Sequence, residues 1–313
     1  MSNTWYLIAN PMAGGGLSDE KWQSIQSALA KAGLEVAVSW SETKEHILNL
    51  VEAAIIKGYR HIIALGGDGT VHHVANGIMK QKEVDSREIV LGTIPAGTGT
   101  DWIKMYGISS DLTAAVRVIK EGKNIFQDIG KVRYTVEGKE QQSFFINVAG
   151  LGYDAEVVKE TEGKTEKGIK GRLTYLWTAL RSINTYKPQS LSISGANFKR
   201  EGLSFFSNVG ICKFSGGGMT MVPRSIPDDG LLDITFMGEM KPWEVYRHIL
   251  KLYTGRIYAY KNAFHHRSPE LDMKSETPIW IEADGELLGT TPAYFECIPH
   301  AIQVRVPSSY ESE

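Results

Sequence analysis

The sequence predicts an α/β fold class with two domains: an N-terminal doubly wound domain and a C-terminal antiparallel, β-rich domain of the sandwich type. Apolar runs alternate with helical segments in the first third of the chain, whereas short alternating strands dominate from about residue 128 onward. At 313 residues the chain is also long for one core, which favours two domains. We place the first at residues 1–128 and the second at 129–299.

The first domain shows four strand signals, each followed by a helix signal. Strands are expected at residues 5–9, 35–40, 61–65 and 89–94, and helices at 19–32, 44–57, 71–79 and 112–120. The second domain has strand signals at 131–136, 143–148, 190–194, 203–211 and 231–236, with helices at 173–183 and 242–252. An apolar stripe on the last helix predicts that it packs against the core through Trp243, Tyr246, Ile249, Leu250 and Tyr253.

Composition excludes several classes of protein. A net charge of −2 gives no global basic field, so nucleic acid is not expected as a partner. The two cysteines, Cys212 and Cys297, lack the spacing of a zinc site or a disulfide framework and predict reduced thiols in a cytoplasmic protein. No segment reaches the roughly 20 apolar residues that span a bilayer, so any membrane contact is expected to be peripheral.

Three glycine-rich loops, at residues 10–16, 66–70 and 95–101, follow strands of the predicted parallel sheet. Such sheets bind ligands beyond the carboxyl ends of their strands. In the second loop, glycines would let a ligand approach the backbone, and Thr70 would cap a helix whose first amides attract anions. None of the loops has a Walker or G-x-G-x-x-G pattern. A phosphate site of another type is therefore predicted, with a simple tight turn as the alternative.

Four ordered motifs give the chain a resemblance to a known family. They are Asn10-Pro11, Gly66-Gly67-Asp68-Gly69-Thr70, Gly97-Thr98-Gly99-Thr100-Asp101 and Glu282-Ala283-Asp284-Gly285-Glu286. Together they resemble the diacylglycerol kinase catalytic-domain family, which includes bacterial soluble lipid kinases and is related to sphingosine and ceramide kinases. The resemblance implies an ATP- and Mg²⁺-dependent kinase that phosphorylates a lipid hydroxyl, giving a phosphatidic-acid-type product.

The resemblance also implies the arrangement of the domains. A nucleotide-binding α/β domain precedes a β-rich lipid-substrate domain, with the active site in the cleft between them. Residues 300–313 are expected as a segment that can return to the first domain. Relatives often pair through their β-rich domains, so a homodimer is one candidate assembly.

By resemblance, the turn after the third strand holds the ATP phosphates, and Asp68 faces the nucleotide and its metal. The other residues implied to bind nucleotide are Asn10, Ser39, Gly66, Gly67, Gly69, Thr70, Gly97 and Thr98. The chain departs from the family pattern in the third loop, where Thr100 replaces Asn and Lys104 replaces Arg. Lysine cannot make the forked contacts of arginine.

Asp284 is the predicted catalytic base, because a carboxylate can accept the proton of the attacking alcohol during phosphoryl transfer. On local sequence alone, Asp284-Gly285 predicts a hairpin turn. Glu286 and Glu282 are rival carboxylates, since two-residue spacing on a strand puts them on the same face. Asp101 is expected near the lipid hydroxyl or Mg²⁺.

A second acidic loop resembles a structural Mg²⁺ site of bacterial relatives. Asp229, with the backbone carbonyls of Ile226 and Leu231, would bind the metal, which suits few carboxylates plus water. The alternative is a hairpin entry turn with solvated aspartates.

Two other functions stay open at this stage: a kinase of a soluble substrate, similar to NAD kinases, and a non-catalytic nucleotide- or lipid-binding regulator. The lipid substrate would be presented at a membrane surface. A basic segment that precedes the helix at 173–183 is a candidate edge for anionic lipid, with a core helix behind a solvated loop as the alternative; its residues are Lys164, Lys167, Lys170 and Arg172.

Overall fold

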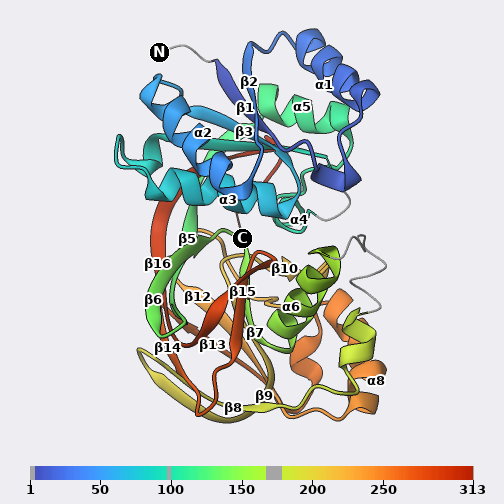
Figure 1. The fold of residues 1–313 in the computed structure, drawn as a ribbon, viewed down its shortest axis with the longest axis vertical. Coiled ribbons are helices and arrows are strands. Elements are labelled where there is room, and N and C mark those ends of the chain that lie inside the picture. The colour runs from blue at the N-terminus through green and yellow to red at the C-terminus, as the bar shows by residue number, and fades with distance from the viewer. Residues whose placement is uncertain (1–3, 97–99, 167–177, 313) are drawn as a thin grey trace. The chain divides into compact units, whose positions relative to one another are not determined.

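The computed structural model describes residues 4–96, 100–166 and 178–312 (Figure 1). The chain divides into two compact units, one formed by Met1–Ile129 with Pro299–Glu313 and the other by Gly130–Ile298. The predicted site residues Gly97 and Thr98, the first part of the predicted helix at 173–183 (residues 173–177), and the basic residues Lys167, Lys170 and Arg172 lie outside the described residues. Within the described ranges, no helix is both long and apolar enough to cross a membrane.

The first unit is built on a parallel sheet, as the sequence predicted. In sheet order its strands are β2 (Val36–Trp40), β1 (Trp5–Ala9), β3 (His61–Gly66), β4 (Val90–Pro95) and the last part of β16 (Glu286–Val306). The β16 segment joins through the parallel register of Gln303 with Val90. Asp128 is fully buried, and its Oδ1 accepts a hydrogen bond from the His300 backbone N–H at 2.7 Å, which ties the returning chain to this unit.

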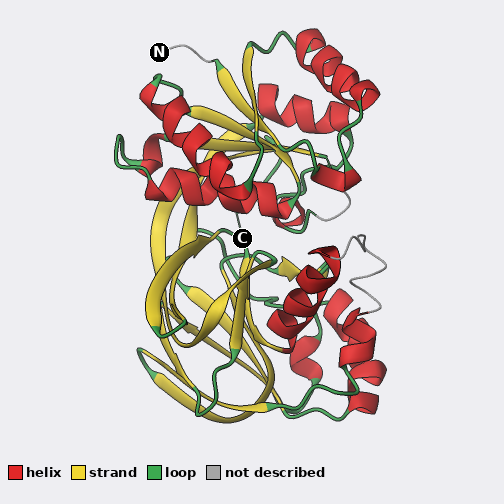
Figure 2. Cartoon of the chain, viewed as in Figure 1, coloured by secondary structure: helices red, strands yellow, loops and turns green. Residues whose placement is uncertain are grey.

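Helices cover both faces of this sheet (Figure 2). On one face, α1 (Asp19–Lys31) and α5 (Leu112–Glu121) pack on a cluster that includes Leu7, Leu65 and Ile94. On the other face lie α2 (Lys44–Ile56) and α3 (Asp68–Lys80). Ser18, Thr43 and Asp111 cap the first turns of α1, α2 and α5 by accepting backbone N–H groups. The remaining helical turns are η1 (Ala13–Gly15), η2 (Ser86–Glu88) and α4 (Trp102–Met105).

The second unit is antiparallel and β-rich. One path of hydrogen-bonded strands runs β13 (Ala263–Ser268), β12 (Leu232–Gly238), β9 (Phe198–Gly210), β7 (Val148–Gly152), β15 (Trp280–Ala283) and β16. Off this path, β14 (Glu270–Lys274) pairs with β16 and β8 (Gln189–Gly195), β8 pairs with β9, and β5 (Lys123–Val136) pairs with β6 (Lys139–Phe145) and β16. The short strands β10 (Phe214–Ser215) and β11 (Met219–Thr220) form a separate hairpin. The helical elements include α6 (Tyr153–Glu166), α8 (Pro242–Tyr253) and η3 (Ile257–Ala259), and residues 178–182, in the predicted helix at 173–183, are also helical.

One predicted strand of the second unit is wrong in an informative way. The sequence predicts a single strand over 143–148, but β6 ends at Phe145 and β7 begins at Val148. At the break, the backbone N–H groups of Ile146 and Asn147 point to the side chain of Asp284 rather than to a neighbouring strand. A tertiary contact therefore ends the strand where its apolar pattern continues.

The core prediction for the last helix is also wrong in part. Four of its five predicted core side chains are exposed: Trp243 (56%), Tyr246 (43%), Leu250 (72%) and Tyr253 (50%). The fifth, Ile249, lines an apolar pocket between α8 and the sheet. Periodicity marks an apolar face but does not say what covers it.

Candidate functional site

In the first unit, the candidate site begins at the turn from β3 into α3. Helix α3 starts at Asp68, earlier than predicted, and Gly67 is its N-cap without a side-chain cap. Thr70 therefore does not cap the helix, which corrects the sequence prediction. It lies buried in the first turn, where its Oγ1 accepts a hydrogen bond from Asn10 Nδ2 at 3.2 Å. Two of the glycine-rich loops are thereby tied together at the start of a helix whose first amides favour anions.

Gly66 is required at this turn by close packing. A Cβ atom added to Gly66 would lie 2.1 Å from Thr70 Oγ1, too close for any side chain. The next glycine, Gly67, has an ordinary φ of −104°. Gly66 therefore allows the Thr70 side chain to pack against the turn, and Gly67 does not serve a left-handed conformation.

Asp68 connects this turn to the loop that follows β4. Its Oδ2 accepts the backbone N–H of Asp101 at 2.8 Å, and its Oδ1 accepts that of Trp102 at 3.2 Å. Asp101 is buried, and its Oδ1 forms an ion pair with Lys104 Nζ at 2.7 Å. Two predicted acidic residues thus adjoin each other, and Lys104, the departure from the family pattern, binds one of them.

Ser39 is less closely tied to this group. It lies near the carboxyl end of the edge strand β2, and its hydroxyl is hydrogen-bonded to the Tyr6 hydroxyl at 2.6 Å. The structure connects Asn10, Gly66, Asp68, Thr70 and Asp101 by contact, but it shows no comparable contact from Ser39 within the described residues. Its predicted role in nucleotide binding stays a prediction.

In the second unit, the candidate site is the hairpin turn between β15 and β16. Asp284 and Gly285 have φ angles of +53° and +87° and connect Ala283 to Glu286, which pair across the hairpin. Two successive positive φ angles are typical of a type I′ turn. The local interpretation as a turn is therefore correct, and it leaves the catalytic interpretation open because the turn also aims the Asp284 side chain inward.

The Asp284 carboxylate is held by the backbone at the β6–β7 break. Oδ1 accepts the N–H groups of Asn147 at 3.0 Å and Val148 at 3.2 Å, and Oδ2 accepts that of Ile146 at 3.0 Å. The Asp284 N–H in turn donates to the Val148 carbonyl at 2.9 Å. Because these donors belong to the backbone, they fix the carboxylate's orientation and stabilise its negative charge.

A second buried carboxyl group, that of Glu282, supports the same turn. Its Oε2 accepts the Gly285 N–H at 2.8 Å, and a Cβ atom added to Gly150 would lie 2.6 Å from its Oε1. Burial raises the pKa of Glu282 well above its ordinary value, and the charges of Asp154 and Asp284 add to the effect. The expectation that spacing puts Glu282, Asp284 and Glu286 on one strand face is wrong, because Asp284 has left the strand.

Sequence reasoning missed two members of this cluster, Asp154 and Asn208. Both approach Gly150: an added Cβ would lie 2.9 Å from Asn208 Oδ1 and 3.2 Å from Asp154 Cβ. A signal existed in the sequence, where Gly150 and Gly152 precede Asp154 directly after a strand. Burial raises the pKa of Asp154 to about 6, against a smaller opposing effect of its hydrogen bond with Asn208.

This raised pKa predicts a stability change in Asp154→Asn. A carboxyl whose pKa is higher in the folded state stabilises the fold at low pH, and that contribution is lost as pH rises through about 6. We expect Asp154→Asn to match the wild type near pH 4 and to be more stable by about 1–2 kcal/mol at pH 8. This is less than the full shift would give, because Asp154 keeps part of its surface exposed.

Urea unfolding at both pH values measures this difference. The exposed residue Glu83 supplies a matched control, since Glu83→Gln also replaces one carboxyl by an amide. The raised pKa of Asp154 would be contradicted if the free energy of unfolding of the wild type, relative to that of Asp154→Asn, increased with pH.

In the predicted metal loop, Asp229 forms an ion pair with an arginine. Asp229 Oδ1 accepts the Leu231 N–H at 3.1 Å, and its Oδ2 is ion-paired with Arg267. Arg267 Nε also contacts Asp233 Oδ2 at 3.1 Å, and Asp233 is fully buried and bonded to His265. In the described part of the chain, no group of three or more His, Cys, Asp or Glu side chains could hold a metal ion. A guanidinium against the same carboxylate opposes a second cation there, so the residues do not fit the metal well.

We therefore expect the thermal unfolding midpoint to stay within about 1 °C when a chelator such as EDTA is added. Arg267→Gln should destabilise the protein by about 1–2 kcal/mol, because the buried Asp233 carboxylate loses its contact with the guanidinium but keeps His265. Differential scanning calorimetry measures both. A midpoint that falls in EDTA and recovers with Mg²⁺ would instead support the metal predicted at Asp229, Ile226 and Leu231.

The described architecture is that of a two-domain protein in which a doubly wound α/β domain precedes an antiparallel, sandwich-like β domain. Residues 4–132 match the family described as "Diacylglycerol kinase catalytic domain", and residues 147–306 match the "YegS C-terminal NAD kinase beta sandwich-like domain". The chain belongs to the diacylglycerol kinase family that combines these two domains.

Comparison with individual proteins agrees with this assignment. The chain is 29% identical over 306 residues to a "Probable lipid kinase YegS-like" of Stenotrophomonas maltophilia, covering 97% of this chain and 96% of the relative. It is 28% identical over 307 residues to the protein of that name in Xanthomonas axonopodis, with the same coverage. Its fold is similar to a crystal structure of a diacylglycerol kinase from Bacillus anthracis, with a TM-score of 0.71, 18% identity, and coverage of 99% and 98%.

Proposed function

We propose that the protein transfers the γ-phosphate of ATP to the hydroxyl of diacylglycerol or a related lipid at a membrane surface. The observation that carries the proposal is the Asp284 carboxylate, which three backbone N–H groups hold in a hairpin turn. The curated relatives are named as lipid kinases, which supports a lipid as the acceptor.

The nucleotide is assigned to the first unit. The turn at Gly66 to Thr70 opens a helix of 13 residues, and the first amides of such a helix bind phosphate oxygens. The Asp68 carboxylate lies in the first turn of that helix and accepts the Asp101 backbone N–H at 2.8 Å, and a single carboxylate suits Mg²⁺ bound together with phosphates and water. When bound, the metal neutralises charge on the phosphates and orients them.

Asp284 is proposed as the general base. It accepts the proton of the lipid hydroxyl while the alcohol oxygen bonds to the γ-phosphorus and the bond to the β,γ-bridging oxygen breaks, releasing ADP. Because its orientation is fixed, the carboxylate does not have to rotate into position before it accepts that proton. The buried Glu282 holds the neighbouring Gly285 N–H and so maintains the turn.

A thin-layer assay with radiolabelled ATP tests the proposal. Diacylglycerol, monoacylglycerol, ceramide, sphingosine and undecaprenol serve as lipid acceptors, NAD serves as a soluble one, and Asp284→Asn is the matched inactive control. We expect label on a glycerolipid with the wild type and none with the variant.

The two other functions give different results in the same assay. Label on NAD alone would favour the soluble-substrate kinase. ATP binding without label on any acceptor would favour a non-catalytic regulator.

A further inference from the structure

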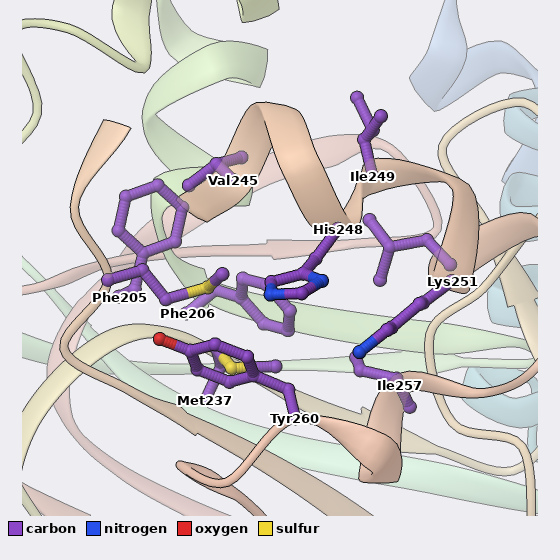
Figure 3. A pocket seen from close by; sticks show the side chains of 11 residues that line it. Phe205, Phe206, Met237, Val245, His248, Ile249, Lys251, Ile257 and Tyr260 are labelled. Atoms are coloured by element: carbon purple, nitrogen blue, oxygen red, sulfur yellow. The ribbon is translucent and has the colours of Figure 1, made fainter. Parts of the chain in front are cut away.

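Helix α8 has two apolar faces, and only the inner one packs against the sheet. The inner face contributes Val245, Ile249 and Leu252 to an apolar pocket. The opposite wall of that pocket comes from the sheet through Phe205, Phe206 and Met237 (Figure 3). All of α8 lies in the described part of the chain, and none of its residues is fully buried.

The outer face holds the four exposed side chains Trp243, Tyr246, Leu250 and Tyr253. Their spacing of three, four and three residues puts them on one side of a helix. Between 43% and 72% of each side chain is accessible to solvent. We call these four residues the α8 outer face. Leu180, itself 37% exposed, adjoins it, because the Tyr246 hydroxyl donates to the Leu180 carbonyl at 3.1 Å.

The chain segment that contains the α8 outer face is basic, although the whole chain has a net charge of −2. Residues 239–261 contain five basic side chains and two acidic ones. The side chain of one of the acidic residues, Glu244, takes part in capping the helix, since it accepts the Lys241 N–H at 2.8 Å. The basic residues are Lys241, Arg247, Lys251, Arg256 and Lys261, of which Lys251 lines the pocket on the inner side of α8 (Figure 3).

We propose that the α8 outer face docks the protein on the surface of an anionic lipid bilayer. A helix with aromatic and leucine side chains on one side and basic residues beside them lies in the plane of the membrane interface. Tyrosine and tryptophan suit that position because one end of each is apolar and the other polar. Each basic residue near an anionic surface adds attraction. The inference rests on the proposed function for the choice of a lipid partner, and its test requires no catalysis.

The test is co-sedimentation of the full chain with phosphatidylcholine vesicles, with and without phosphatidylglycerol, in the absence of nucleotide. We expect the wild type to bind the anionic vesicles, and Trp243→Ala with Leu250→Ala to bind them at least about tenfold more weakly. The matched control Ile56→Ala with Leu203→Ala removes two side chains that are also exposed, 63% and 47%, but lie outside α8. It should bind like the wild type.

A second pair of variants keeps the test decisive if the first folds poorly. Arg247→Gln with Arg256→Gln leaves the apolar face intact and should weaken binding to anionic vesicles about tenfold. Salt should weaken wild-type binding in the same direction.

Three results would overturn the proposal: no wild-type binding to anionic vesicles, binding as strong as that of the wild type by both the Trp243→Ala, Leu250→Ala pair and the Arg247→Gln, Arg256→Gln pair, or a dimer that the Trp243→Ala and Leu250→Ala pair dissociates. The last would show that a second copy covers the outer face. Vesicle binding without kinase activity on any lipid would refute the proposed function while leaving this surface in place.

Discussion

Replacing Asp284 by asparagine is expected to lower turnover at least about a thousandfold, because the amide cannot accept the alcohol proton as a carboxylate does. Nucleotide binding should stay within about twofold of the wild type, since the nucleotide is assigned to residues of the other unit. The change also turns an NH₂ group toward backbone N–H donors, so we expect a loss of about 1–2 kcal/mol in stability. Single-turnover kinetics and ATP titration measure the first two effects.

Glu286→Gln is the matched control, because it removes the rival carboxylate next to the same turn. It should keep activity within about tenfold of the wild type. Near wild-type turnover in Asp284→Asn would contradict the assignment of the base, and a loss confined to Glu286→Gln would transfer the role to Glu286.

The order of helices and strands follows from local sequence, and so do several of their ends. Alternation of apolar strands with capped helices predicts the first unit, and Ser18 and Thr43 mark helix starts by side-chain contacts three residues along. The break between β6 and β7 could not be predicted in this way. It depends on Asp284, which lies 137 residues beyond Asn147 in sequence, and local patterns do not include such contacts.

The candidate site likewise has residues that the sequence predicts and contacts that it does not. The motifs identified Asp68 and Asp284, but they did not predict the backbone N–H groups that bind each carboxylate. Asp154 was missed although glycines precede it, because its significance lies in the burial it shares with Glu282. For α8, the apolar stripe was visible, but periodicity cannot distinguish a face that packs on the core from one that faces solvent.

The second large effect is expected from Asp68→Asn. Both carboxylate oxygens of Asp68 accept backbone N–H groups, from Asp101 and Trp102. Asparagine has one acceptor oxygen, and its NH₂ group would face the remaining N–H donor. We expect a stability loss of about 1–2 kcal/mol. We also expect affinity for Mg²⁺·ATP to fall at least about tenfold, because the turn and the adjoining loop are no longer held together and one charge near the metal is lost.

Asp85→Asn separates the two effects, because Asp85 also accepts a backbone N–H, from Arg87 at 3.0 Å, at an exposed turn of the same unit. It should change stability by a comparable or smaller amount and leave nucleotide affinity unchanged. Isothermal titration calorimetry with ATP, with and without Mg²⁺, and urea unfolding measure both quantities. If Asp68→Asn loses stability but binds Mg²⁺·ATP like the wild type, Asp68 organises the loop without facing the nucleotide. A loss that appears only with Mg²⁺ present would instead identify Asp68 as a metal-facing carboxylate, because its backbone contacts are the same with and without the metal.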